Sequence, residues 1–214
     1  MTGKVKSLNL VYTNPGQPNT SGYYPSNVNS TVAHGQVNTK DLPLLYKKNK
    51  DPGVYGYCLA LNRDILYTGM NFSDSIYTYN EITGAKKNIA IPSNYMNGKS
   101  CGILSMCIDN RQNLWCGTAD NGILIFNIPA QKWVRNISQR DGYFPVLTKG
   151  IVADDDGVVW CGTSEGLFSF NPDNFRFKNF TLNEGLHSEN DGGNLLVLPG
   201  HRLVSNNINY PFYE

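Results

Sequence analysis

Two stretches of the chain alternate apolar and polar residues in nearly the same order. Residues 113–127 read NLWCGTADNGILIFN, and residues 158–171 read VVWCGTSEGLFSFN. In each stretch, an apolar run that ends in Trp-Cys-Gly-Thr is followed by a turn and by a second run of alternating large apolar residues. Alternation of this kind, bounded by Gly, Asn and Asp, is typical of half-buried antiparallel strands. The pattern therefore predicts a strand–turn–strand unit that occurs twice.

The duplicated unit extends beyond this pair of strands. Residues 104–138 and residues 149–181 each begin with an apolar run that ends in Asp, and each finishes with an amphipathic run, KWVRNI or FRFKNF. Each copy therefore predicts four short antiparallel strands joined by tight turns. The positions that the two copies share are Asp109 and Asp154, Trp115 and Trp160, Gly117 and Gly162, and Thr118 and Thr163.

Two weaker copies flank this pair. Residues 57–91 form a full unit in which Tyr67 takes the place of Trp and Gly69 takes the place of the shared Gly. Residues 192–214 form an incomplete unit. Residues 1–56 break the pattern, because they are rich in Pro, Gly and Asn, and they predict one or two strands and a long loop segment.

A repeated four-stranded sheet predicts how the copies are arranged. One such sheet leaves both faces uncovered, and stacking several sheets around an axis buries those faces against one another. We therefore expect an all-β protein, a β-propeller of four-stranded antiparallel blades, about four in number, in either a closed or an incomplete ring. Trp115 and Trp160 should fill the space between blades, and Gly117 and Gly162 should let a neighbouring backbone approach closely.

The charge balance excludes some partners. The 214 residues carry a formal net charge of +1, so we expect neither nucleic acid nor an anionic membrane surface as a partner. No apolar run is long enough to span a membrane, and the first residues, MTGKVKSLNLVYTNPG, lack the apolar core of a signal peptide. We expect neither a membrane segment nor a signal peptide in this chain.

The cysteines predict packing rather than chemistry. Cys58, Cys101, Cys107, Cys116 and Cys161 form no C-x-x-C pair, and four of them lie within apolar runs. Zinc sites need close Cys and His pairs, which the sequence lacks. We therefore expect buried, unpaired thiols that act as small hydrophobic side chains.

The sequence also lacks motifs that would indicate a catalytic site. The chain has no G-x-S-x-G nucleophile elbow, no P-loop and no G-x-G-x-x-G. The run DDDG at residues 154–157 lacks the alternating ligands and distal Glu of a calcium loop and predicts a hairpin turn. Acidic residues in the linkers leave a glycosidase or lyase as an alternative. We expect no catalytic residue, no metal site and no cofactor.

The duplicated motif resembles a known family. The stretches NLWCGTADNGILIFN and VVWCGTSEGLFSFN, each preceded by an Asp, resemble the two-component regulator propeller repeat, and NEGLHSEN at residues 183–190 resembles its linker. That repeat builds the periplasmic sensor region of hybrid two-component systems in Bacteroidetes. The resemblance implies a periplasmic, non-catalytic sensor of oligosaccharides, with further blades and any kinase activity in parts absent from this chain, and a dimer formed through the propeller.

Ligand contacts are expected in the linkers between blades, which should gather at one end of the propeller. These linkers cover residues 91–100, 138–149 and 182–192, and loops on a rigid scaffold are where binding residues concentrate. Charge, aromatic stacking and hydrogen bonding suited to a sugar are offered by Tyr95, Arg140, Tyr143 and His187. The alternative is that these four are ordinary solvated loop residues. A propeller-based carbohydrate-active enzyme and a protein-interaction propeller are the other functions left open.

Overall fold

The computed structural model describes residues 57–70, 73–96, 101–144, 147–186, 194–198 and 202–206. The predictions made for residues 1–56 and for His187 lie outside these residues. Helical structure in the described part is limited to three short 3-10 turns, η1 (Ser93–Tyr95), η2 (Gln139–Asp141) and η3 (Leu182–Glu184). All other regular structure there is β-strand.

The strands form three complete antiparallel sheets and part of a fourth. Blade I contains β1 (Tyr57–Asn62), β2 (Ile65–Met70), β3 (Ser75–Asn80) and β4 (Lys86–Ala90). Blade II contains β5 (Ile103–Ile108), β6 (Asn113–Thr118), β7 (Ile123–Asn127) and β8 (Lys132–Ile137). Blade III contains β9 (Thr148–Ala153), β10 (Val159–Thr163), β11 (Gly166–Phe170) and β12 (Phe177–Phe180). Blade IV is represented by β13 (Asn194–Leu198) and β14 (Arg202–Asn206).

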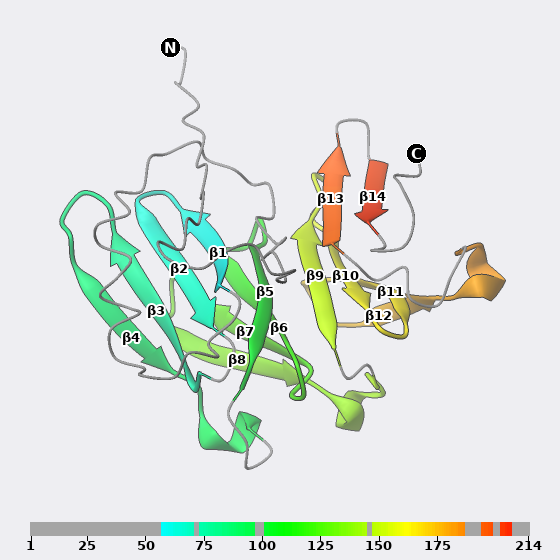
Figure 1. Ribbon diagram of the computed structural model, residues 1–214, viewed down its shortest axis with the longest axis horizontal. Coiled ribbons are helices and arrows are strands. Elements are labelled where there is room, and N and C mark those ends of the chain that lie inside the picture. The colour runs from blue at the N-terminus through cyan, green and yellow to red at the C-terminus, as the bar shows by residue number, and fades with distance from the viewer. Residues whose placement is uncertain are drawn as a thin grey trace, which may run out of the picture.

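The sheets follow one another around an arc (Figure 1). Within each complete sheet the strands lie in chain order, and the first strand of each blade lies against the first strand of the next, β1 against β5, β5 against β9 and β9 against β13. This arrangement confirms the predicted fold class, an all-β propeller of four-stranded antiparallel blades.

The up-and-down order of strands gives the propeller two distinct ends. Linkers between blades and the loops between second and third strands share one end, which we call the linker end. The loops between first and second strands and between third and fourth strands share the other, which we call the hairpin end. Any surface built from linkers therefore lies at a single end of the described sheets.

The core is divided between the blade interfaces. One cluster of buried residues joins blades I and II, and a second joins blades II and III. Alternation along β6 and β7 explains this division, because successive side chains of a strand point to opposite faces. Leu114 and Cys116 belong to the first cluster, whereas Trp115, Ile123 and Ile125 belong to the second.

Trp115 fills the space between blades II and III. Its side chain is 0% exposed, and its ring centroid lies 5.7 Å from that of Phe170 and 5.9 Å from that of Phe175, both in blade III. The expectation that Trp115 packs between blades is thus confirmed. Trp160 is only half-buried, and its ring lies 5.7 Å from Phe180 of its own blade.

Gly117 lies where blades II and III pack closely together. A Cβ on this residue would stand 2.6 Å from Cγ2 of Thr148 and 2.7 Å from Oγ of Ser105. The predicted close approach is confirmed, but the neighbours are side chains of the first strands of blades II and III rather than backbone. Gly69 is in the same position, because its Cβ would stand 2.7 Å from Cγ2 of Ile103.

Candidate functional site

Two of the linkers are built on the same local structure. Ser138 and Thr181 begin one 3-10 turn each, and the acid three residues later bonds back to the backbone N–H of that first residue, Asp141 at 3.0 Å and Glu184 at 2.8 Å. These are capping boxes, in which a carboxylate satisfies an otherwise unpaired donor. The sequences SQRDGY and TLNEGL therefore repeat a backbone structure rather than a binding motif.

A glycine ends each of these turns. Gly142 has a φ of 83° and Gly185 has a φ of 99°, a conformation that other residues adopt at a cost. After each glycine, the next residue donates its backbone N–H to the first residue of the turn, Tyr143 to Ser138 at 3.1 Å and Leu186 to Thr181 at 3.1 Å. The linkers therefore direct the residue after the glycine toward the sheets.

The acids of the linkers have structural partners. Arg135 of β8 forms an ion pair with Asp141. The pKa of the Glu184 carboxyl is lowered chiefly by the hydrogen bond from the Thr181 hydroxyl and by that from the Thr181 backbone. Both carboxylates are thus held as caps.

Tyr143 is a core residue, which corrects its prediction as a ligand contact. Its side chain is 1% exposed, and its hydroxyl lies 2.8 Å from Oγ1 of Thr148. Its ring packs edge-on against Phe168, with centroids 5.0 Å apart. Burial raises the pKa of this phenol. The glycine-ended turn carries the ring inward, so Tyr143 joins blades II and III and offers no surface to a ligand.

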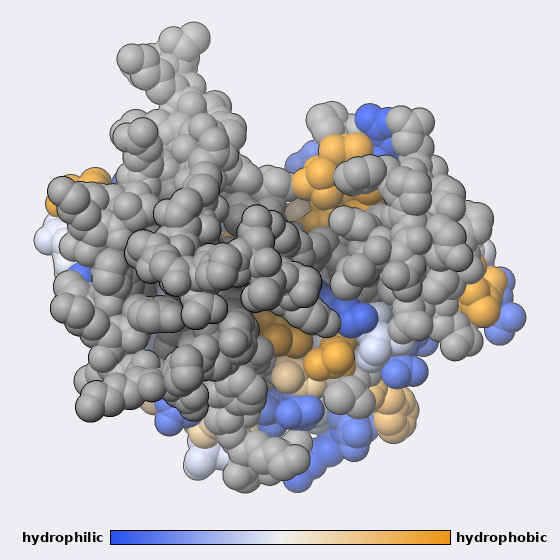
Figure 2. All heavy atoms as spheres, viewed as in Figure 1, coloured by the Kyte–Doolittle hydropathy of each residue, from blue (hydrophilic) through white to orange (hydrophobic). Residues whose placement is uncertain are grey.

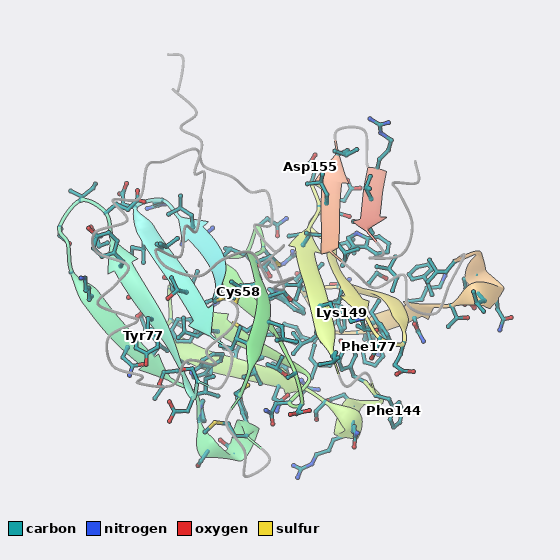
Figure 3. The ribbon with its side chains drawn as sticks, viewed as in Figure 1. Cys58, Tyr77, Phe144, Lys149, Asp155 and Phe177 are labelled. Carbon is teal, nitrogen blue, oxygen red and sulfur yellow. The ribbon has the colours of Figure 1, made fainter. Side chains whose placement is uncertain are left out.

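The exposed part of this linker lies on either side of Tyr143. Arg140 is exposed, and it forms no hydrogen bond or ion pair with the other described residues. Phe144 is 67% exposed and Leu147 is 36% exposed, and Figure 3 shows Phe144 at the margin of the molecule. A cationic side chain and a free aromatic ring on one short linker can contact a polar ligand with a hydrophobic face, such as a sugar. Sequence reasoning missed Phe144, although it follows Tyr143 directly.

Tyr95 lies in the linker between blades I and II, as the last residue of η1. Its half-buried ring packs against the core cluster of these blades, and its carbonyl accepts a hydrogen bond of 3.4 Å from Nδ2 of Asn136. Tyr95 and Arg140 belong to successive linkers and therefore share the linker end. Of the four predicted contacts, these two remain candidates and His187 lies outside the described residues.

The shared Asp of the repeat holds the shared Trp, a contact that sequence reasoning missed. Oδ2 of Asp109 accepts hydrogen bonds from Nε1 of Trp115 at 2.8 Å and from Nδ2 of Asn113 at 3.0 Å, while Oδ1 accepts from the backbone of Arg111 and Asn113. In blade III, Oδ2 of Asp154 accepts from the indole N–H at 2.7 Å. The recurrence of Asp six residues before Trp was the signal. These residues are structural parts of each blade.

All five cysteines are buried and unpaired, as predicted. Burial raises the pKa of Cys58 and of Cys101 to about 12, and it raises the pKa of Cys107, Cys116 and Cys161 well above 9. A thiol reacts as its thiolate. The two Trp-Cys-Gly-Thr motifs therefore carry thiols that are shielded and protonated at neutral pH.

Two other kinds of feature are absent from the described residues. No group of three or more His, Cys, Asp or Glu side chains in them is arranged to hold a metal ion. Among the same residues, no helix has the length and apolar character needed to cross a membrane.

Comparisons with known proteins show which solved structures have a similar fold. No family profile matches the sequence, and no curated protein matches it. The fold is similar to the extracellular domain of the putative hybrid two-component system BT3049 from B. thetaiotaomicron, with a TM-score of 0.54 and 21% identity. It is also similar to the extracellular domain of BT4673 from the same organism, with a TM-score of 0.50 and 19% identity.

A third similar structure is PorZ, a surface component of the type-IX secretion system of Porphyromonas gingivalis, with a TM-score of 0.57 and 15% identity. The matches cover 71%, 75% and 70% of this chain but only 20%, 21% and 22% of the three proteins. The chain thus spans about a fifth of the length of each. At these identities the likeness shows the fold alone, and the chain is similar in fold to extracellular domains of hybrid two-component systems.

Proposed function

We propose that this chain is part of a non-catalytic, ligand-sensing β-propeller that works outside the cytoplasm, in the periplasm, and responds to oligosaccharides. The shared fold with extracellular domains of putative hybrid two-component systems supports the sensor assignment. In such a system the propeller binds the ligand and a separate part of the protein transmits the response. We further propose that two copies associate through their propellers, which would let ligand binding change the relation between them.

The observation that carries this proposal is that some linker residues build the turn, whereas others are exposed and differ from one linker to the next. Positions that recur between linkers, such as Asp141 and Gly142, serve the turn itself. Arg140 and Phe144 differ from their counterparts in the next linker and are exposed. Because the turn fixes the backbone of Arg140, a ligand would order only the side chain of this residue, which reduces the entropic cost of binding.

The test is a thermal-shift screen of the full chain against neutral and acidic oligosaccharides. A ligand at about one hundred times its Kd should stabilise the fold by about 2.7 kcal/mol and raise Tm by roughly 5–10 °C. The variants Arg140→Ala and Phe144→Ala should lose this shift. Arg176→Ala is the matched control, because Arg176 is exposed at the hairpin end and its loss should leave the shift unchanged.

The same samples separate the alternatives. Chromatography of the oligosaccharides after incubation would reveal shorter products if the propeller were a glycosidase or lyase, and such products would overturn the sensor proposal. A folded chain that responds to no glycan would leave the protein-interaction propeller as the better assignment. Light scattering with and without the glycan tests the proposed association of two copies.

A further inference from the structure

One side-chain amide between blades I and II has an unused hydrogen-bond acceptor. Asn136 lies near the end of β8, and its Nδ2 donates to the carbonyl oxygen of Tyr95 across 3.4 Å, which is long for such a bond. Oδ1 of Asn136 is buried and accepts no hydrogen bond from the described residues. Reversing the amide would set Oδ1 against the Tyr95 carbonyl oxygen and leave Nδ2 unused instead. A buried polar atom without a partner costs free energy, so native structures keep few of them.

The next blade carries the same amide in a different setting. Register pairs Asn136 with Leu124 and Asn179 with Phe168, so the two amides occupy the same position on successive blades. Both point toward the preceding blade, because Leu124 belongs to the core cluster of blades I and II and Phe168 to that of blades II and III. Asn179 is exposed, whereas Asn136 is half-buried and bonds to Tyr95. The burial of Asn136 is therefore tied to the linker that carries Tyr95.

This linker is held less firmly than the two linkers that follow it. The η1 turn begins after Pro92, which provides no side-chain cap, and it ends at Met96 in an extended conformation. By contrast, η2 and η3 each have a capping box and end in a left-handed glycine. We call residues 92–96 the η1 flap. Moving the flap breaks one long hydrogen bond and the contacts of two half-buried side chains, Tyr95 and Met96, but no capped turn.

An aromatic ring lies on the same face as Asn136. Trp133 pairs with Phe126, two residues from Leu124 on β7, so the indole and the amide are neighbours on the side of β8 toward blade I. Nε1 of Trp133 donates to the carbonyl oxygen of Ala90 at 2.8 Å, and the ring packs edge-on against Phe126 with centroids 5.4 Å apart. Trp133 is thus fixed in orientation although it is only half-buried. A fixed ring beside an unused acceptor suits a sugar, which has an apolar face and hydroxyl groups at its edge.

We propose that Oδ1 of Asn136 accepts a hydrogen bond from a hydroxyl group of the bound oligosaccharide, and that the η1 flap moves aside to admit the sugar onto Trp133. This inference rests on the proposed function and adds a specificity-determining residue that lies on a strand. Arg140 follows Asn136 by four residues, so their Cα atoms are at most about 14 Å apart, which a short oligosaccharide spans. Figure 2 shows hydrophilic residues around a hydrophobic one at the margin where Figure 3 labels Phe144, a mixture that suits the rest of the same ligand.

Replacing Asn136 by leucine separates a ligand role from a structural role. Leucine nearly keeps the shape of asparagine and removes the unused acceptor, so the Tm of the free Asn136→Leu chain should stay the same or rise. The Kd for a bound glycan should rise at least about ten-fold, the factor that corresponds to 1.4 kcal/mol. Isothermal titration calorimetry of the full chain measures Kd, with maltooligosaccharides as the neutral probes and oligogalacturonides as the acidic probes. Asn179→Leu is the matched control, because the equivalent amide is exposed and its loss should leave Kd unchanged.

Amide hydrogen exchange, followed by NMR, tests the η1 flap. The backbone N–H groups of Met96 and Gly142 are equivalent, because each donates to the carbonyl oxygen of the first residue of its turn, Ser93 or Gln139. After correction for the intrinsic rate of each residue type, Met96 should exchange at least about ten-fold faster than Gly142 in the free chain. Saturation with a probe glycan that binds should change the exchange rate of Met96.

The outcomes distinguish this inference from the proposed function. A glycan that binds the unaltered chain and Asn136→Leu with equal Kd would overturn the role of Asn136 and leave the sensor proposal standing. A lower Tm of the free Asn136→Leu chain would overturn it as well, because Asn136 would then be a structural residue. Equal protection of Met96 and Gly142 would contradict the movement of the flap. If no glycan of either series bound the unaltered chain, the proposed function and this inference would fail together.

Discussion

Trp115 and Trp160 occupy equivalent positions on successive blades, but their surroundings differ. Trp115 and Trp160 each follow an Asp that accepts the indole N–H. Trp115 is completely buried, whereas Trp160 is half-buried. The local sequence is nearly the same, so the difference comes from the neighbour. The sheet that follows a blade therefore contributes to the burial of that blade's tryptophan.

The largest expected difference concerns the two tryptophans. Trp115→Ala should lower the free energy of unfolding by about 3–5 kcal/mol, because it removes a completely buried ring. Trp160→Ala should lower it by roughly 1–2 kcal/mol, because part of this ring is already in contact with water. Urea denaturation followed by far-UV circular dichroism measures both values. Equal losses would contradict the view that the following blade sets the burial of each ring.

The two aspartates provide a smaller version of the same comparison. Asp109→Asn should lower the free energy of unfolding by roughly 2–3 kcal/mol. The Asp109 carboxylate accepts four hydrogen bonds, and the amide of Asn would turn an N–H₂ group toward some of the same donors. Asp154→Asn should cost about 1 kcal/mol, because Asp154 has fewer bonds and a more exposed site. Urea denaturation again gives both values. An Asn at either position that proved neutral would contradict the requirement for two acceptor oxygens at that position.

Gly117 tests how closely blades II and III approach. Gly117→Ala should cost about 1–3 kcal/mol, because the new methyl group overlaps Cγ2 of Thr148. Thr148→Ser removes that methyl group and keeps the hydroxyl that bonds to Tyr143. The double variant should therefore recover part of the loss. Additive losses in the double variant would place the strain elsewhere.

Alkaline pH tests the closed interface between blades I and II. Burial raises the pKa of Cys58 from 9.0 to about 12, so the folded chain favours the protonated thiol more strongly than the unfolded chain does. This contribution is complete below pH 9 and is lost as the pH rises from 9 toward 12. Between pH 8 and pH 10 the loss is roughly 1 kcal/mol.

The measurement compares the pH dependence of urea midpoints for the unaltered chain and for Cys58→Ala. The variant should be less stable at pH 8 and should lose less stability by pH 10. Parallel pH profiles for the two proteins would show that the Cys58 thiol has the same pKa in the folded and the unfolded chain.

The smallest effect belongs to the ion pair at the hairpin end. Nε and Nη2 of Arg111 in blade II lie 2.6 Å from the two carboxylate oxygens of Asp173 in blade III. Both side chains are substantially exposed, 37% and 64%, so Arg111→Ala should cost at most about 1 kcal/mol. Added salt should reduce this cost further. Arg63→Ala, at the corresponding hairpin of blade I, is the control, and an equal loss there would contradict a specific link between blades II and III.

The repetition in the sequence was enough to predict the strands, the blade order and the inward place of Trp115. These features depend on alternation and on turn residues, which are local properties. The bond between Asp109 and Trp115 was not predicted, because the five residues between them form a hairpin that only the fold brings back on itself. The burial of Tyr143 was missed for a similar reason, since the glycine of the linker turn directs its side chain inward. The exposure of Phe144 follows from the same turn.

The order of the inner strands has a consequence for how the protein is assembled. Because β1 lies against β5, β5 against β9 and β9 against β13, each sheet contacts the sheets that precede and follow it in the chain. Contacts of this kind allow a chain to fold progressively, one sheet serving as the template for the next. The N-terminal blades can therefore form before the C-terminal strands have left the ribosome or a translocation pore, and each new sheet shields the apolar face that its predecessor left open.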